Sequence, residues 1–145
     1  MSAVRHEIPG DDLKTFFEGG FSRHALAQTG IDGAVGEPKA FVIRDDAGVV
    51  CAAVVARLFW GQLHIKNVLC AENARGQGYA QRLMDEAHAW GRTQGCDFAF
   101  VETMSFQAEG FYKKLGYVTE YTRQGYAAGT SFIYMKKDLK DTAYA

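Results

Sequence analysis

The sequence predicts a layered α/β fold in which helices pack against a mixed β-sheet. Residues 63–70 alternate loosely and are rich in apolar side chains, a pattern typical of a strand. Over residues 76–93, apolar side chains instead recur at helical spacing and give one apolar face. Further β-like runs lie on both sides of this central strand and helix. Together these patterns predict helices between strands at the centre of the chain and hairpins at each end.

The N-terminal part is predicted to hold one strand and two short helices. Residues 3–8 are β-like and end at a Pro-Gly pair. A helix with an apolar face is expected at 11–18, capped by one of its two leading aspartates. The pair Gly19-Gly20 is expected to end this helix, and a second short helix is expected at 22–30. Residues 30–38 contain three glycines and are predicted to form a loop.

The remaining residues continue the alternation of β-like and helical patterns. The tetrapeptide at 45–48, Asp-Asp-Ala-Gly, is a hairpin signal because aspartate and glycine favour tight turns. No linker-like stretch or internal repeat interrupts the chain, so a single domain over residues 1–145 is expected. We predict strands at 40–44, 49–60, 98–103, 117–123 and 131–137, a short helix at 106–115 and a connection at 125–129.

The composition excludes several classes of protein. The chain has a net charge of −1 and no basic block, so nucleic acid is not expected as a partner. No apolar run approaches the roughly 18 residues of a membrane helix, and the N-terminus lacks a signal-peptide pattern. The cysteines at 51, 70 and 96 are odd in number and lack the close Cys/His pairing of a zinc site. We therefore expect a soluble cytoplasmic protein with neither a metal nor a membrane partner.

A glycine-containing motif joins the central strand to the central helix. It reads Arg75-Gly76-Gln77-Gly78-Tyr79-Ala80, and its glycines allow a close turn that leaves N–H groups free at the start of the helix. Such a turn suits a phosphate or pyrophosphate. A Walker loop would need Gly-Lys-Ser/Thr, which the chain lacks. A dinucleotide fingerprint would need a third glycine at Gln81 and a later acid, and Glu102 lies about where that acid falls, so this alternative stays open.

The motif resembles the pyrophosphate-binding signature of the GNAT superfamily of N-acetyltransferases, Arg/Gln-x-x-Gly-x-Gly/Ala, which residues 75–80 match. A second element of that family is matched by residues 102–117, in which a strand leads into a short helix that carries Tyr112. The family often has asparagine seven residues before this tyrosine, where the present chain has Ser105. The two elements lie in the family's order, and the resemblance covers residues 62–117.

The resemblance implies both the fold and the activity. It implies a mixed, mostly antiparallel sheet flanked by helices, with two central strands that splay apart so that acyl-CoA can enter between them. It also implies transfer of an acetyl group from acetyl-CoA to a primary amine of a small molecule or peptide, by direct attack in a ternary complex. Relatives often dimerise, so a homodimer is expected. The implied cofactor contacts are Val68, Leu69, Cys70, Arg75, Gly76, Gln77, Gly78, Tyr79, Ala80 and Ser105.

Acetyl transfer requires a neutral amine, a stabilised oxyanion and an exit for the thiolate. An alkylamine of pKa about 10.4 is mostly charged at pH 7, and removing its proton costs roughly 4–5 kcal/mol, so a base helps. His64 can exchange protons near neutral pH, and Glu102 could act through water; both remain candidates. Tyr112 is expected to hydrogen-bond the developing thiolate, as the family's tyrosine does. Backbone N–H groups within 68–70 are expected to stabilise the oxyanion.

Two rival functions remain compatible with the sequence. A catalytically silent acyl-CoA-binding or ligand-sensing module would keep the phosphate loop without turnover. Ser105 in place of asparagine favours this rival, whereas Tyr112 argues against it. A nucleotide-binding protein could use the same loop, in which case ATP or NAD would bind as well as coenzyme A does.

Overall fold

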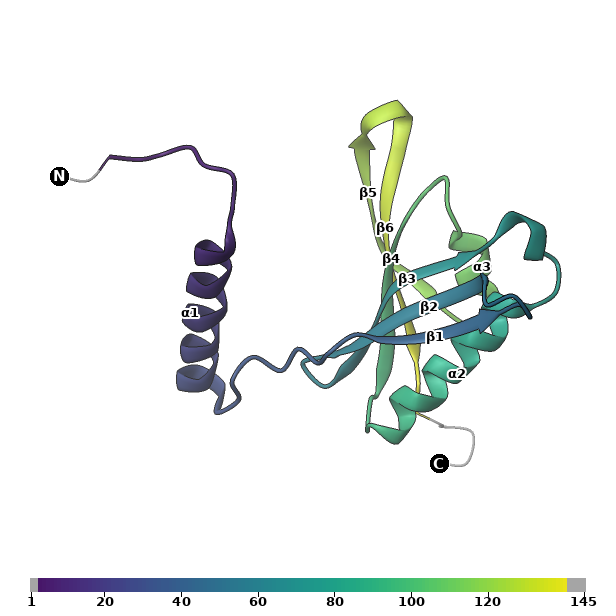
Figure 1. The fold of residues 1–145 in the computed structure, drawn as a ribbon, viewed down its shortest axis with the longest axis horizontal. Helices are drawn as coiled ribbons and strands as arrows, with labels where there is room; N and C mark the ends of the chain where they lie inside the picture. The colour runs from purple at the N-terminus through teal and green to yellow at the C-terminus, as the bar shows by residue number, and fades with distance from the viewer. Residues whose placement is uncertain (1–2, 141–145) are drawn as a thin grey trace. The chain divides into compact units, whose positions relative to one another are not determined.

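The computed structural model describes residues 3–140, and the chain divides into two compact units at Ala34/Val35. Each unit is described by itself. The larger unit is built on a six-stranded sheet with the strand order β1-β2-β3-β4-β6-β5 (Figure 1). Its strands are β1 (Lys39–Arg44), β2 (Val50–Phe59), β3 (Gln62–Cys70), β4 (Phe98–Met104), β5 (Val118–Tyr126) and β6 (Thr130–Asp138). Its helices are η1 (Glu72–Ala74), α2 (Tyr79–Thr93), α3 (Glu109–Lys114) and η2 (Ala127–Gly129).

The smaller unit corrects two predictions. Residues 3–8 form no strand, and α1 (Asp11–Thr29) runs without interruption through Gly19 and Gly20, where a break was predicted. A glycine inside a helix costs only about 1 kcal/mol, which the rest of a long helix can offset. The predicted end is correct, because Gly30 adopts a left-handed conformation with φ 80° and its N–H bonds the Leu26 carbonyl. None of the described helices is long and apolar enough to cross a membrane.

The sheet is mixed and mostly antiparallel, as predicted. The β1–β2 hairpin turns at Asp45, whose Oδ1 accepts hydrogen bonds from the N–H groups of Ala47 and Val49. The pairs β1–β2, β2–β3, β4–β6 and β5–β6 are antiparallel, and only β3–β4 is parallel. Within the described residues, the β3–β4 pairing covers residues 63–65 and 99–101 alone. Beyond it β3 continues to Cys70 bonded only to β2, so the two central strands splay as expected.

A β-bulge in β3 explains why residues 63–70 alternate only loosely. Val55 pairs with Asn67 and Ala56 pairs with Ile65, so Lys66 is the extra residue. The inward-facing positions therefore change parity along the strand, from residues 63 and 65 before the bulge to residues 68 and 70 after it. The bulge lies where β3 loses β4 as a neighbour.

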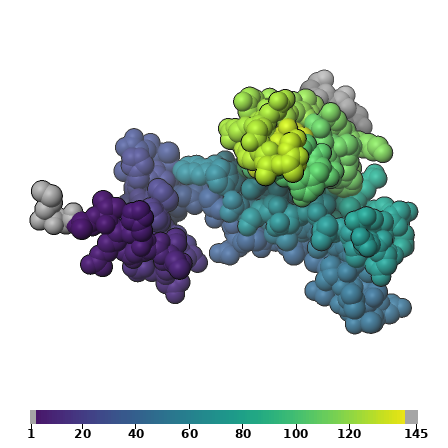
Figure 2. Space-filling model, turned by 90° about the horizontal axis from the view of Figure 1, so that it is seen from above, coloured from purple at the N-terminus to yellow at the C-terminus, as the bar shows by residue number. Residues whose placement is uncertain are grey.

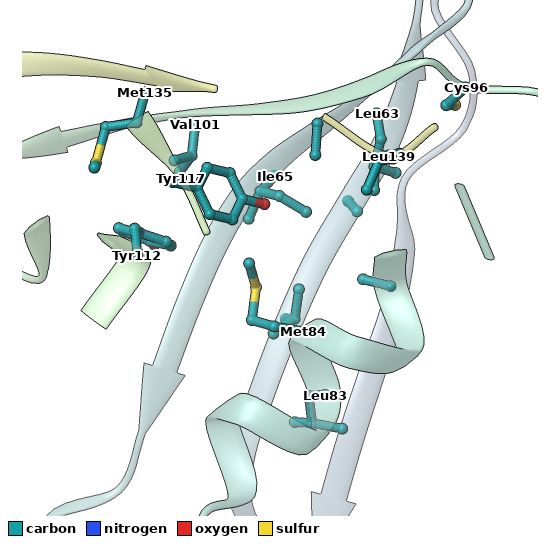
Figure 3. Packing of buried hydrophobic residues seen from close by; sticks show 14 of the residues in the cluster. Leu63, Ile65, Leu83, Met84, Cys96, Val101, Tyr112, Tyr117, Met135 and Leu139 are labelled. Carbon is teal, nitrogen blue, oxygen red and sulfur yellow. The ribbon is translucent and has the colours of Figure 1, made fainter. Parts of the chain in front are cut away.

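The core lies between the sheet and α2, which contacts β1, β2 and β3 (Figure 1). Gly91 allows close approach, since a Cβ there would lie 2.9 Å from Leu63 Cδ2. The helix begins three residues later than predicted, because Gly76 and Gly78 both have left-handed φ values. α3 is also shorter than predicted. Figure 3 shows the packing of the buried residues, which include Leu63, Ile65, Leu83, Met84, Val101, Tyr112, Tyr117, Met135 and Leu139.

The β5–β6 hairpin forms one edge of the sheet and carries several aromatic side chains. Most residues of β5 are exposed, among them Tyr121 and Tyr126. Tyr121 packs against Tyr134, and Tyr126 packs against Phe132. The hairpin is the yellow-green surface in Figure 2. An exposed edge strand can pair with a second chain, and the expected homodimer stays a prediction.

Candidate active site

Two hollows lie at the point where β3 separates from β4. We call the first the loop hollow; it is lined by Cys70, Ala74, Arg75, Gly76, Gly78, Tyr79, Ala80, Gln81 and Phe111. We call the second the splay hollow; it is lined by Lys66, Asn67, Val68, Leu69, Val101, Glu102, Thr103, Gln107, Ala108 and Tyr112. On β3, Leu69 lines the splay hollow and the next residue, Cys70, lines the loop hollow. On α3, Tyr112 lines the splay hollow and Phe111 lines the loop hollow, so the two hollows adjoin.

The loop hollow has the features of an anion site. Gly78, the residue before α2, has φ 75° and no side chain to cap the helix. The first N–H groups of α2 have no partner within the helix and carry the positive end of its dipole. A Cβ at Gly76 or Gly78 would meet nothing within 4 Å, so these glycines leave open space beside the helix start. Arg75 adds a positive charge. Arg75 and the start of α2 could therefore hold a pyrophosphate in this hollow.

The splay hollow holds a buried phenol. Tyr112 on α3 is 5% exposed and packs edge-on against Phe111 and Tyr117, with ring centroids 5.3 and 5.5 Å away. Burial raises the pKa of Tyr112 to about 12, because the phenolate would be poorly solvated. Tyr112 is therefore a neutral phenol at physiological pH and can donate a hydrogen bond into the hollow that it lines.

Backbone N–H groups are available on β3 beside this phenol. Val68 and Leu69 line the splay hollow, and Cys70 lines the loop hollow. On one side this stretch is bonded to β2, with Val68 opposite Val54. Successive N–H groups of a strand point to opposite sides, so alternate ones here point into the gap left by β4. These groups can stabilise an oxyanion between the strands.

The structure joins the two candidate bases into one hydrogen-bonded pair. His64 on β3 and Glu102 on β4 meet through Nε2 and Oε2, which lie 2.8 Å apart. Glu102 lines the splay hollow, and His64 does not. The side chain of His64 is 14% exposed and that of Glu102 is 30% exposed. The imidazole stacks on Phe100 with ring centroids 4.6 Å apart and 7° between the planes. Glu102 is therefore the member of the pair that an incoming substrate can reach.

Two predicted cofactor contacts, Ser105 and Gln77, are absent from the lining of both hollows. The Ser105 Oγ accepts a hydrogen bond from the Ser131 N–H, which ties the end of β4 to β6. The Gln77 Oε1 accepts a hydrogen bond from the Tyr79 hydroxyl. A contact from either residue to a cofactor stays a prediction.

Several lining residues were not predicted from the sequence. They come from β3 beside its bulge, from β4, from the segment that leads into α3, and from α2 and α3 themselves: Asn67, Thr103, Gln107, Ala108, Gln81 and Phe111. Four of them lie next to motif residues and could have been found by extending each motif along its helix or strand: Gln107, Ala108, Gln81 and Phe111. Asn67 and Thr103 depend on the splay of the strands, which no local pattern specifies. Among residues 3–140, no group of three or more His, Cys, Asp or Glu side chains is arranged to hold a metal ion.

Comparison with known proteins gives one consistent family. The model of the acetyltransferase (GNAT) domain matches residues 37–119. Blasticidin-S acetyltransferase of Streptomyces morookaense is 33% identical over 95 residues, which cover 65% of this chain and 70% of that protein. A solved acetyltransferase from Bacillus cereus ATCC 14579 has a TM-score of 0.79 at 21% identity and covers 93% of this chain and 97% of its own.

A further solved structure is described as a streptothricin acetyltransferase from Bacillus anthracis str. Ames in complex with acetyl coenzyme A. It has a TM-score of 0.61 at 19% identity, and the match covers 68% of this chain and 61% of that one. At this identity the likeness concerns the fold alone.

Proposed function

This chain belongs to the GNAT acetyltransferase family, and we propose that it transfers an acetyl group from acetyl-CoA to the primary amine of a small molecule. The observation that carries the proposal is the continuity of the two hollows. An anion site at the start of α2 leads directly to a cleft that contains a neutral phenol and a carboxylate. These are the groups that amide formation from a thioester requires.

The acetyl donor is proposed to bind along both hollows. Arg75 and the free N–H groups at the start of α2 would hold the pyrophosphate in the loop hollow. The thioester would then lie in the splay hollow, where N–H groups of residues 68–70 can donate hydrogen bonds to its carbonyl oxygen as negative charge develops there. In this arrangement the thiolate leaves beside Tyr112.

Tyr112 is proposed to donate a hydrogen bond to the departing sulfur without giving up its proton. Full transfer from a phenol of pKa about 12 to a thiolate whose conjugate acid has a pKa of about 8.5 would be uphill by about 5 kcal/mol. A hydrogen bond to a charged acceptor instead contributes roughly 1.5–3 kcal/mol and requires no transfer. The proton that the thiolate finally takes comes from the acceptor ammonium.

Glu102 is proposed to be the proton acceptor. Of the paired residues Glu102 and His64, only Glu102 lines the splay hollow. Its carboxylate can take the first proton of the acceptor ammonium, directly or through water, and thereby supply the neutral amine that attacks the thioester. A cationic acceptor is also attracted to this carboxylate. The named relative, Blasticidin-S acetyltransferase, supports a small molecule over a protein as the acceptor.

The experiment is a coenzyme A titration followed by an amine screen. Calorimetric titration should give saturable binding of coenzyme A, whereas ATP and NAD should not compete with it. Release of free thiol from acetyl-CoA should then rise in the presence of particular small amines. Binding without thiol release across a broad panel of amines would indicate the silent acyl-CoA-binding module, and no binding at about millimolar coenzyme A would overturn the proposal.

A further inference from the structure

Two buried nitrogen atoms on neighbouring strands lack hydrogen-bond partners. They are Arg57 Nε on β2 and His64 Nδ1 on β3, and neither has a partner among residues 3–140. Buried polar atoms are nearly always paired, so each such atom requires an explanation. The two residues lie directly opposite each other in the antiparallel β2–β3 pair. Directly opposite residues place their side chains on the same face of a sheet, with Cβ atoms about 5 Å apart.

The two atoms are chemically complementary. The Nε of an arginine is always a donor, whereas the Nδ1 of a neutral histidine is an acceptor when its proton is on Nε2. Aromatic rings hold both side chains on this face. The Arg57 guanidinium lies over Phe59, with Cζ 5.6 Å from the ring centroid, and the Phe59 ring meets His64 edge-on at 6.4 Å. The stack on Phe100 fixes the other side of the imidazole.

We propose that Arg57 is a positioning residue for Glu102 and acts through His64. The Arg57 Nε–H donates to His64 Nδ1, directly or through one water, and so places the imidazole proton on Nε2. The His64 Nε2–H then donates to Glu102 Oε2 at the observed 2.8 Å. This chain of donors runs in one direction, from β2 across β3 to β4, and it leaves the remaining lone pairs of Glu102 to take a proton from the acceptor. The proposal rests on the proposed function, in which Glu102 is the proton acceptor.

The alternative protonation states of His64 are unfavourable in this setting. A neutral imidazole with its proton on Nδ1 would place two buried N–H donors against each other and turn the Nε2 lone pair toward a carboxylate. Each buried polar group left unpaired costs about 1–3 kcal/mol. An imidazolium would satisfy Glu102 but would put a second positive charge opposite the guanidinium. A guanidinium keeps its protons at any physiological pH, so Arg57 can only donate.

Other charged groups near this pair lie on adjoining strands. Lys136 of β6 is opposite Phe100, and Tyr134 of β6 is opposite Glu102. Lys136 lies over the ring of Phe98, with Nζ 4.9 Å from the centroid, and is 3.4 Å from Asp138. Lys66 lies at the bulge and lines the splay hollow. The structure pairs none of these described side chains with His64, so Arg57 remains the donor placed opposite its ring.

Nitrogen NMR of the histidine side chains tests the proposal without requiring turnover. Long-range ¹H–¹⁵N correlation spectra at pH 7.5 distinguish the two neutral tautomers, and the signals of His64 are identified by their loss in His64→Gln. We expect the wild-type His64 to be neutral with its proton on Nε2. Arg57→Met keeps the aliphatic stem but removes the donor, and it should lower the fraction of His64 in the neutral Nε2–H form. Arg57→Lys, which retains a donor, should restore the Nε2–H form.

A matched control is Arg44→Met, which removes an arginine of β1 that bonds the Gly48 carbonyl and does not face His64. It should leave the His64 signals unchanged. In the assay, Arg57→Met should lower kcat about tenfold and leave the KM for acetyl-CoA within twofold, because the loop hollow is untouched. A wild-type His64 with its proton on Nδ1, or a tautomer unchanged in Arg57→Met, would overturn the proposal. If the wild-type protein acetylated none of the amines but Arg57→Met still changed the His64 tautomer, the proposed function would be wrong. The effect of Arg57 on the His64 tautomer would still be supported.

Discussion

Replacing Tyr112 with phenylalanine removes one hydroxyl from the splay hollow and keeps the buried ring. The ring packs between Phe111 and Tyr117, so most of its burial survives the change. The lost interaction is a hydrogen bond that reaches full strength only as the sulfur becomes charged. Such a bond contributes roughly 1.5–3 kcal/mol, which corresponds to a loss in kcat of about 10- to 150-fold. Binding of coenzyme A should change little, because the pyrophosphate site lies in the other hollow.

The neighbouring Tyr117 provides a matched control. It is also buried, but its hydroxyl lies 2.7 Å from His88 Nε2 and lines neither hollow. Tyr117→Phe should therefore leave kcat within about twofold and lower the free energy of unfolding by about 1–3 kcal/mol, because His88 loses its partner. Tyr112→Phe should show the opposite pattern, with a large fall in kcat and little change in stability.

The assay is single-turnover thiol release with saturating acetyl-CoA, together with denaturant unfolding of both variants. Single-turnover conditions separate the chemical step from product release. A kcat for Tyr112→Phe within twofold of the wild type, with chemistry rate-limiting, would refute the reasoning. The thiolate would then leave without a hydrogen bond from Tyr112, and Tyr112 would serve only in packing.

Two further predictions concern the loop and the buried histidine. Gly78 and Gly95 both have left-handed φ values and open space at the Cβ position, so replacement of either by glutamate adds similar backbone strain of about 1 kcal/mol. Only Gly78→Glu puts a carboxylate into the loop hollow, so only this variant should bind coenzyme A tenfold or more weakly in calorimetric titration. Equal affinities of the two variants for coenzyme A would contradict the loop hollow as the pyrophosphate site. Burial, aided by Lys137 and Arg92, lowers the pKa of His88 to about 4, so the unfolded chain binds this proton more tightly than the folded chain. Stability should fall by about 2 kcal/mol from pH 7 to pH 5, and His88→Gln should lose most of that dependence in denaturant titrations; an unchanged dependence would assign it to other groups.

The sequence predicts those features that depend on contiguous residues. The loop at 75–80 and the tyrosine at 112 belong to short motifs whose spacing is local, and the structure places both beside adjoining hollows. The hairpin at 45–48 is equally local. The prediction of a strand at 3–8 is wrong because a strand needs a neighbouring strand to hydrogen-bond, and a β-like composition does not supply one.

The arrangement of the base could not be predicted because it depends on register. His64 and Glu102 are 38 positions apart and meet because the parallel register of β3 and β4 places His64 opposite Phe100, two residues before Glu102. The residue that Arg57 faces depends on the bulge. If the pairing of Val55 with Asn67 continued without a bulge, Arg57 would lie opposite Ile65 instead of His64, and Ile65 would turn out of the core, because β2 itself alternates without interruption.

The single extra residue at Lys66 therefore links three parts of the site. Before it, Arg57 and His64 share the face of the sheet on which Glu102 lies. After it, β3 has lost β4 as a neighbour, and its free N–H groups border the splay hollow. Bulges commonly occur beside active sites because they redirect side chains and end strand pairing, and this one does both. Deleting Lys66 would turn the outward positions of one half of β3 inward, which would separate His64 from Glu102 or remove Val68 from the core.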